Sequence, residues 1–157
     1  MWPAAQSCSY PVLLEFPAPD ILVYPPEAVI AEKLEAIVVL GERNSRIKDF
    51  FDLRYLAGRF AFHRATLGEA VRRTLGRRST PLPADEPIGL TRACWDNPSR
   101  PPQVRAFARR AGLTVGADPG VELLAVLRPF LLPILEDVRR GAAMSGTWPP
   151  GGPWEGA

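Results

Sequence analysis

Two consecutive helix patterns, joined by a short polar turn, most constrain the fold of this chain. The first pattern begins after a Pro-Pro pair and runs to about Leu40, and Gly41 follows it, as is typical of helix C-termini. After the turn, Asn44 or Ser45 is suited to cap a second helix over residues 46–59. Helices joined by so short a turn pack antiparallel, so we expect their facing side chains to meet.

Both lysines of the chain lie in this stretch, whereas arginines occur at 17 positions throughout. On a helical wheel of about 100° per residue, Lys33 falls inside the apolar arc of the first helix. Two interpretations follow: the stem of Lys33 lies along the core edge with its ammonium in water, or the ammonium lies at the floor of a cleft, where it binds phosphate or compensates a charge. Three acidic residues fall on the opposite side, where we expect them to face solvent: Glu32, Glu35 and Glu42.

The second helix supplies carboxylates that can pair with these lysines. Lys48 and Asp52 are four residues apart, which predicts a solvent-facing ion pair worth about 0.3–0.5 kcal/mol. Asp49 lies on another face, and a carboxylate in the first turn of a helix is also common for electrostatic reasons alone. Because the two helices face each other, we expect Lys33 and Asp49 to form an ion pair. In a cleft, such a pair is a catalytic candidate.

The remaining sequence predicts a mainly α protein, a helical bundle with a short N-terminal β-hairpin. Two apolar runs on either side of a Pro-Ala-Pro-Asp turn, residues 10–16 and 21–24, predict the two strands. Residues 1–9 have no periodicity and predict a frayed terminus. Such a hairpin is marginally stable alone, because two strands need further strands or a helix against them.

The later helices are separated by proline- and glycine-containing breaks. Thr66 and Glu69 fit a capping box at the start of a third helix. Pro129 and Pro133 lie inside the last helix pattern and predict that this helix is kinked or split. We expect helices over residues 66–77, 102–111 and 118–140, and a Gly/Pro-rich disordered tail over residues 141–157.

Composition indicates an ordinary globular protein of one domain, with 157 residues and a net charge of +2. This charge gives no general attraction to nucleic acid or membranes. Cys8 and Cys94 have no metal-binding spacing and form no disulfide framework, which favours a reducing compartment. No signal-peptide pattern is present, and the most apolar stretch, residues 121–135, is shorter than the ~20 residues of a membrane span. We expect a cytoplasmic protein without a membrane span.

Three motifs carry a resemblance to a known family: YPPEAVIAEKLEAIV at residues 24–38, NSRIKDFFDLRYLA at residues 44–57, and the arginine-rich run from Phe62 to Pro83. Through them, the chain resembles the nucleotidyl transferase AbiEii/AbiGii toxin family of type IV toxin–antitoxin and abortive-infection phage-defence systems. The resemblance implies a polymerase-β-like core followed by a helical C-terminal part. It also implies transfer of a nucleotide from a nucleoside triphosphate (NTP), with Mg²⁺, to an acceptor such as tRNA, and a cognate antitoxin as partner.

The resemblance also implies roles for residues of the first two helices. Lys33 matches the lysine motif expected to contact the nucleotide phosphates, and Lys48 is a second nucleotide-binding candidate. Asp49 matches the later aspartate motif and Asp52 lies beside it, so the candidate catalytic residues are Lys33, Asp49 and Asp52. No residue is assigned to a metal, because the chain has no Asp-x-Asp or Asp-x-Glu motif. Two-metal phosphoryl chemistry needs such carboxylates.

This departure from the family pattern predicts a C-terminal portion of the toxin that is inactive alone. Residues 1–24 are then the end of a truncated nucleotidyltransferase core, and residues 25–140 are the helical C-terminal domain. Mg²⁺ and NTP are expected for the intact fold, and neither is expected to be bound by this chain alone. Two alternatives stay open: a non-catalytic helical module that binds an antitoxin or RNA, and a decayed gene remnant.

The remaining candidates are one histidine, two tryptophans and seven arginines. His63, in a loop, is expected at the surface rather than as a catalytic base. Trp148 and Trp154 either form an adhesive segment or belong to the disordered tail. Seven arginines either follow an RNA backbone or form solvated helix faces: Arg72, Arg73, Arg77, Arg78, Arg105, Arg109 and Arg110.

Overall fold

A computed structural model describes residues 2–9, 20–141 and 143–156 of the chain. Within these residues the protein is mainly helical, as the sequence predicts. The helices are α1 (Pro26–Leu40), α2 (Ile47–Arg59), α3 (Arg64–Arg78), α4 (Arg92–Trp95), α5 (Arg100–Ala111) and α6 (Pro119–Arg140). Short 3₁₀ turns cover Gly41–Arg43 and Ile88–Leu90, and the strands are β1 (Gln6–Ser9), β2 (Asp20–Val23), β3 (Phe62–His63) and β4 (Thr147–Trp148).

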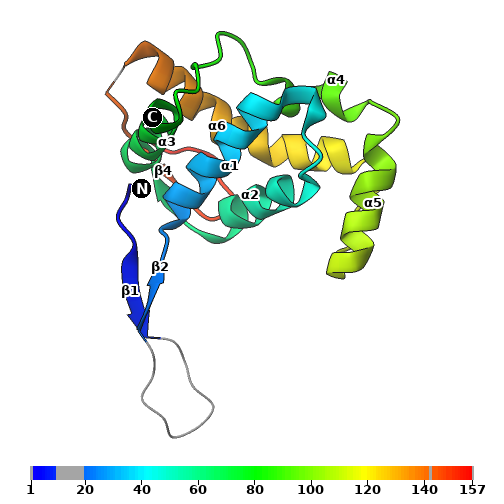
Figure 1. Cartoon of the computed structure of the whole chain (residues 1–157), viewed down its shortest axis with the longest axis horizontal. Coiled ribbons are helices and arrows are strands. Elements are labelled where there is room, and N and C mark those ends of the chain that lie inside the picture. Colours follow the sequence, from blue (N-terminus) through cyan, green and yellow to red (C-terminus); the bar gives the residue numbers. More distant parts are fainter. Residues whose placement is uncertain (1, 10–19, 142, 157) are drawn as a thin grey trace, which may run out of the picture.

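Helix α1 lies between α2 and α3, and α6 packs against both of these neighbours (Figure 1). The four helices enclose one hydrophobic core, to which each contributes fully buried side chains, including Leu34, Phe50, Leu67 and Phe130. Helix α1 begins after two prolines, with Glu27 in its first turn, where the helix dipole favours an acid. Because α1 is covered on two flanks, its side chains on both flanks form interhelical contacts.

Helix α6 is one continuous helix of 22 residues. The predicted split at Pro129 and Pro133 is therefore not observed. Pro129 lies on the exposed side of the helix, as does Ala125, whose carbonyl loses its hydrogen-bond donor to the proline ring. That carbonyl can be hydrated, so the helix continues through the proline. The side chains of the buried face, among them Leu127 and Phe130, hold it against the core.

The C-terminal segment is packed against the bundle, and the prediction of a disordered tail is wrong for residues 143–156. Strand β4 pairs antiparallel with β3, so that Phe62 lies opposite Trp148. Trp148 is only 2% exposed, and its indole N–H donates to the carbonyl of Ala57 at 2.8 Å. Trp154 stacks on Phe130 with ring centroids 5.9 Å apart. Two large aromatic side chains supply enough apolar contact to order a segment that is otherwise rich in Gly and Pro.

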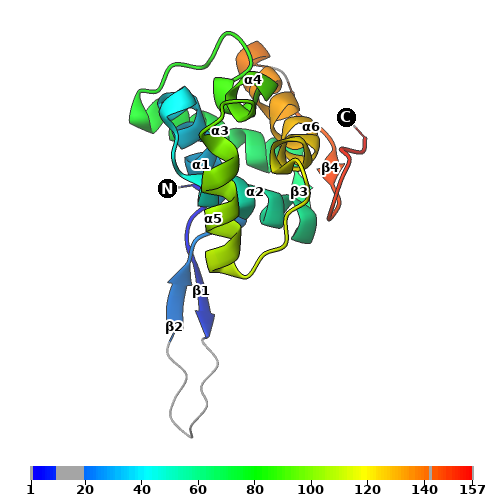
Figure 2. The ribbon, with the colours of Figure 1, turned by 90° about the vertical axis from the view of Figure 1, so that its right-hand side faces the viewer.

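The N-terminal hairpin projects away from the helices (Figures 1 and 2). Its strands β1 and β2 pair antiparallel, with Gln6 opposite Val23. The predicted second strand therefore agrees with β2, whereas the predicted frayed terminus is wrong for residues 6–9. The predicted first strand, residues 10–16, lies outside the described residues. Leu22 is 74% exposed, so the described part of the hairpin places apolar surface in solvent.

Two local predictions at helix starts are corrected by the structure. Helix α3 begins at Arg64, before the expected capping box, and no side chain caps it. Helix α2 begins after Arg46, whose side chain makes no capping hydrogen bond either.

Within the described ranges, no helix has both the length and the apolar character needed to cross a membrane.

Candidate functional site

Lys33 on α1 meets two aspartates of α2, and this confirms the predicted contact with Asp49. The Lys33 Nζ donates to Asp49 Oδ1 at 2.6 Å and to Asp52 Oδ2 at 2.8 Å. The two aspartates are three residues apart, a spacing that places them on one face of a helix. The wheel had assigned Asp52 only to a solvent-facing pair with Lys48, so its contact with Lys33 is new information from the structure.

The turn between α1 and α2 fixes this geometry. Asn44 is fully buried, and its side-chain oxygen accepts a hydrogen bond from the Arg46 backbone N–H at 2.9 Å. The guanidinium of Arg100, from α5, donates to the Asn44 backbone carbonyl. Ile47 and Phe50 then bury one side of α2 in the core, so the side with Asp49 faces α1. Asn44 thus stabilises the turn. It does not cap α2, so the capping role that the sequence predicts for it is wrong.

Lys33 and its partners lie at the boundary between core and solvent. The Lys33 side chain is 18% exposed, which agrees with its place in the apolar arc. Burial alone lowers the pKa of Lys33, but its hydrogen bonds to Asp49 and Asp52 outweigh burial and hold this pKa above the ordinary 10.5. For Asp52, burial alone raises the pKa, yet the hydrogen bonds from Lys33 and Lys48 bring it below the ordinary 3.8. Lys33 and Asp52 are therefore both charged at neutral pH.

Lys48 lies on the outer side of the same cluster. Its ammonium donates to Asp52 Oδ2 at 2.5 Å, and its side chain is 68% exposed. The predicted surface pair between Lys48 and Asp52 is thus confirmed. Because Asp52 accepts from both lysines, the exposed Lys48 and the half-buried Lys33 belong to one network of two cations and two carboxylates.

A cleft of about 270 Å³ opens beside this network. Lys33 and Asp49 form part of its wall, and two further cations line it, Arg46 before α2 and Arg78 at the end of α3. Its other lining residues are Glu32, Ala36, Val29 and Tyr24. The three cationic side chains outnumber the two carboxylates of the lining, Glu32 and Asp49, and this positive excess suits an anion such as a polyphosphate.

A second ion-pair cluster lies on the α3 side of α1. Glu35 is only 5% exposed, although the helical wheel placed it in solvent. Its carboxylate accepts hydrogen bonds from Arg78 at 3.0 Å and from the Thr80 hydroxyl at 2.7 Å. The wheel prediction fails for Glu35 because α3 covers this flank of α1. No signal within the α1 sequence reveals this, since both partners come from residues more than 40 positions later.

The arginines of α3 make ion pairs within the protein. Arg72 and Arg73 both pair with Glu69 on the same helix. Arg77 pairs with Glu32 at 3.0 Å. With Arg78 bonded to Glu35, all four α3 arginines considered for RNA contact have carboxylate partners, which weakens the case for RNA binding on this helix. His63 is exposed, as expected, but it lies in the short strand β3 and not in a loop.

The comparisons with known proteins identify the family. A family model described as "Nucleotidyl transferase AbiEii toxin, Type IV TA system" matches residues 1–119, about three quarters of the chain. The chain belongs to the AbiEii family. The matched region includes every residue of the Lys33 network and its cleft, and membership in a toxin–antitoxin family implies a cognate antitoxin. No curated protein and no solved structure matches the chain.

Proposed function

We propose that this AbiEii chain forms the nucleotide-phosphate side of a nucleotidyltransferase site, in a toxin that transfers a nucleotide from an NTP to an acceptor such as tRNA. The observation that supports the proposal is the Lys33 ammonium, held by two aspartates beside a cleft that also contains Arg46 and Arg78. Family membership supplies the reaction class, and the cleft supplies a cationic position for its phosphates.

Each residue of the network has a distinct role in this proposal. Lys33 contacts the phosphates of the nucleotide, because it is the half-buried cation of the cleft. Asp49 and Asp52 hold its ammonium in place and keep it protonated, which preorganises the charge before the nucleotide arrives. Lys48 neutralises Asp52 on the solvent side and offers a second cation at the rim.

The aspartates of this network do not fit a two-metal centre. Asp49 and Asp52 are both engaged by lysines, and no cluster of three metal-ligating side chains occurs in the described part of the chain. The sequence also has no Asp-x-Asp motif. We therefore propose that the Mg²⁺-binding carboxylates of the family reaction are supplied from outside this chain, and that the chain alone transfers no nucleotide.

The cleft modifies one expectation. The sequence led us to expect no NTP bound by the chain alone, but the convergence of Lys33, Arg46 and Arg78 leads us to propose weak, metal-independent binding of the triphosphate. Loss of one charge-assisted contact corresponds to about 10- to 100-fold in affinity. In the presence of a chelator, Lys33→Ala should therefore weaken NTP binding by about this factor, measured by calorimetry.

The matched control is Arg140→Ala, which removes an exposed cation at the end of α6, outside the cleft. Its NTP affinity should equal that of the wild type. Equal affinity of the wild type and Lys33→Ala would contradict the assigned phosphate contact. A separate assay with Mg²⁺, labelled NTPs and tRNA tests the inactivity proposal, and any incorporation of label by the chain alone would contradict it.

A second candidate function is a non-catalytic helical module, in which the network only clamps α1 to α2. It is favoured by the two carboxylate partners that Lys33 already has within the protein. In this case Lys33→Ala changes stability and leaves NTP binding absent in both proteins. The calorimetric experiment therefore separates the two functions.

A further inference from the structure

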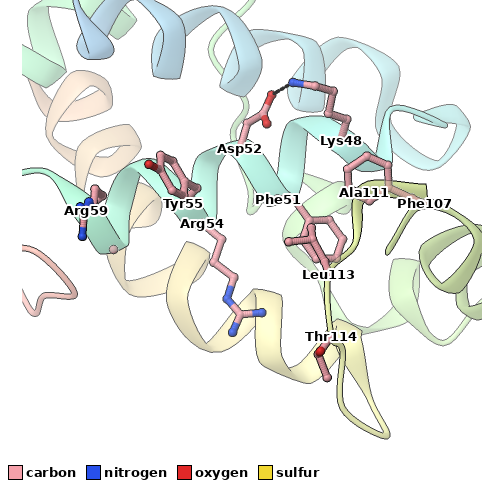
Figure 3. Close-up of a pocket in the computed structure, with 11 residues that line it drawn as sticks. Lys48, Phe51, Asp52, Arg54, Tyr55, Arg59, Phe107, Ala111, Leu113 and Thr114 are labelled. Atoms are coloured by element: carbon pink, nitrogen blue, oxygen red, sulfur yellow. Dashed lines mark hydrogen bonds and ion pairs between the residues drawn. The ribbon is translucent and has the colours of Figure 1, made fainter. Parts of the chain in front are cut away.

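A groove lies between α2 and α5, and Asp52 of the Lys33 network is one of its lining residues. Its volume is about 650 Å³, within the range of small-molecule sites. The groove is lined by aromatic and apolar side chains from both helices and the following segment (Figure 3): Phe51, Tyr55, Phe107, Ala111 and Leu113. The proposed function leaves this groove without a role.

The aromatic side chains of the groove offer planar surface to a ligand. Tyr55 on α2 lines the groove and is 63% exposed (Figure 3). Phe51 and Phe107 pack against each other with ring centroids 5.1 Å apart, so the groove has an aromatic floor. Exposed aromatic rings are a surface on which unpaired nucleobases stack.

The groove is also cationic, despite the small net charge of the chain. Lys48, Arg54 and Arg59 line it, and Asp52 is its single acidic lining residue. Asp52 is already bonded to two lysines. Arg54 lies 3.6 Å from Glu122 of α6, a long and half-exposed ion pair that leaves its guanidinium accessible at the rim.

A neighbouring hollow extends this cationic surface toward the Lys33 cleft. It shares Lys48 and Phe107 with the groove and adds Arg46 and Arg110. Arg46 also lines the Lys33 cleft. Shared basic side chains, Arg46 and Lys48, thus link the three hollows into a row from the proposed phosphate site to the aromatic groove.

We propose that the groove between α2 and α5 binds a single-stranded nucleic acid. Its bases stack on Tyr55 and on the Phe51–Phe107 floor, and its phosphates contact Arg59 and the row of cations that leads to Arg46. This inference extends the proposed function, because a strand in this row ends near the Lys33 cleft, where an acceptor would have to meet the nucleotide. RNA and DNA share the chemistry that the groove recognises, so the experiment includes both.

The stacking part of the proposal is tested with Tyr55→Ala. Loss of one base–aromatic stack costs about 1–3 kcal/mol, which corresponds to about 5- to 150-fold weaker binding. We expect Tyr55→Ala to bind labelled single-stranded RNA and DNA oligonucleotides of one sequence more weakly than the wild type by this factor, measured by fluorescence anisotropy. The wild type should bind the matching duplex more weakly than the single strand. The matched control is Phe60→Ala, which removes another exposed aromatic residue that does not line the groove.

The charge part is tested with Arg59→Ala, compared with Arg140→Ala at the end of α6. Removal of one phosphate contact reduces the slope of log affinity against log salt by about 0.7 for a single strand. Arg59→Ala should show this reduction and Arg140→Ala should not. Equal slopes in both variants would overturn the assignment of Arg59 to the strand.

Failure of this inference is distinguishable from failure of the proposed function. If Lys33→Ala weakens NTP binding but Tyr55→Ala leaves oligonucleotide binding unchanged, the groove proposal is overturned and the phosphate site stands. If the Tyr55 effect is present without any NTP binding, the groove proposal stands and the phosphate site falls. A third outcome is also informative. If the protein binds no oligonucleotide and the α2–α5 face becomes more protected from hydrogen exchange as the protein concentration rises, the face is a protein interface and the proposal is overturned.

Discussion

Helix α1 carries two ion-pair clusters of opposite charge arrangement on its two flanks. Toward α2, the cation Lys33 is central and receives two carboxylates. Toward α3, the carboxylate of Glu35 is central and receives Arg78 and Thr80. Both clusters tie α1 to a neighbour, but they differ in burial, because the Lys33 ammonium borders a cleft and Glu35 is enclosed.

This difference separates a structural role from a binding role. Glu35 is nearly buried and hydrogen-bonded on both oxygens, so a ligand has no access to it and Glu35 acts through stability. Lys33 is also bonded, yet it shares its cleft with Arg46 and with Arg78, the partner of Glu35. Arg78 thus belongs to the Glu35 cluster and also lines the Lys33 cleft, so the Glu35 cluster holds one of the cations of the proposed phosphate site in position.

The largest expected effect is on the Glu35 side. Glu35→Ala removes two hydrogen bonds from a nearly buried carboxylate and should reduce the free energy of unfolding by about 2–3 kcal/mol, measured by urea denaturation. Glu35→Gln, which keeps the shape and one acceptor, should lose about 1 kcal/mol. A loss below about 0.5 kcal/mol in the alanine variant would remove the structural role of this cluster.

On the Lys33 side, the expected loss of stability is smaller because the network is partly solvated. Lys33→Ala leaves Asp49 and Asp52 close together without their shared cation and should cost about 1–2 kcal/mol. A double-mutant cycle with Asp49→Ala should give a coupling energy of about 1 kcal/mol in urea denaturation. Additive effects of the two substitutions would show that the pair contributes no coupling.

The pKa shifts predict opposite pH limits for this network. The pKa of Asp52 is lowered in the folded state, so its contribution to stability is full above about pH 4 and is lost as the pH falls through its folded pKa. The pKa of Lys33 is raised, so its contribution is present below about pH 10 and is lost as the pH rises through its folded pKa. In Asp52→Asn, the free energy of unfolding should therefore fall less steeply below about pH 4 than in the wild type, measured by urea denaturation at a series of pH values. An unchanged slope below about pH 4 would contradict the contribution assigned to Asp52.

The smallest effect is expected at Lys48. Its ion pair with Asp52 spans one helical turn and is largely exposed. Lys48→Ala should therefore cost about 0.3–0.5 kcal/mol in the free energy of unfolding, and raised salt should remove most of this difference. A loss as large as that of Lys33→Ala would erase the distinction between the inner and outer lysine.

The two clusters also show which parts of the site could be predicted from the sequence. Lys33 and Asp49 were predicted to meet because only a short turn separates their helices. Glu35 was assigned to solvent because its partners, Arg78 and Thr80, arrive only when α3 returns along α1. A helical wheel describes one helix, so it cannot anticipate which of its flanks a later helix covers.

The same reasoning applies to the fold. The mainly α class and the α1–α2 hairpin follow from local periodicity and turn residues, which a sequence displays directly. The packed C-terminal segment does not, because its order depends on Trp148 and Trp154 meeting Phe130 of α6. Gly/Pro-rich composition indicates disorder only where no such aromatic contact is available.

The central claim, that Lys33 contacts nucleotide phosphates, can be tested by a chelator-treated NTP titration followed through the lysine side chains. With lysine labelled with ¹³C at the ε carbon alone, the chain gives two labelled side-chain signals, one each from Lys33 and Lys48, because it contains no other lysine. The Lys33 signal is assigned by its absence from the spectrum of Lys33→Arg. We predict that NTP shifts this signal saturably, with a midpoint equal to the calorimetric Kd. A Lys33 signal that stays unchanged at NTP concentrations that saturate the calorimetric binding would contradict the account.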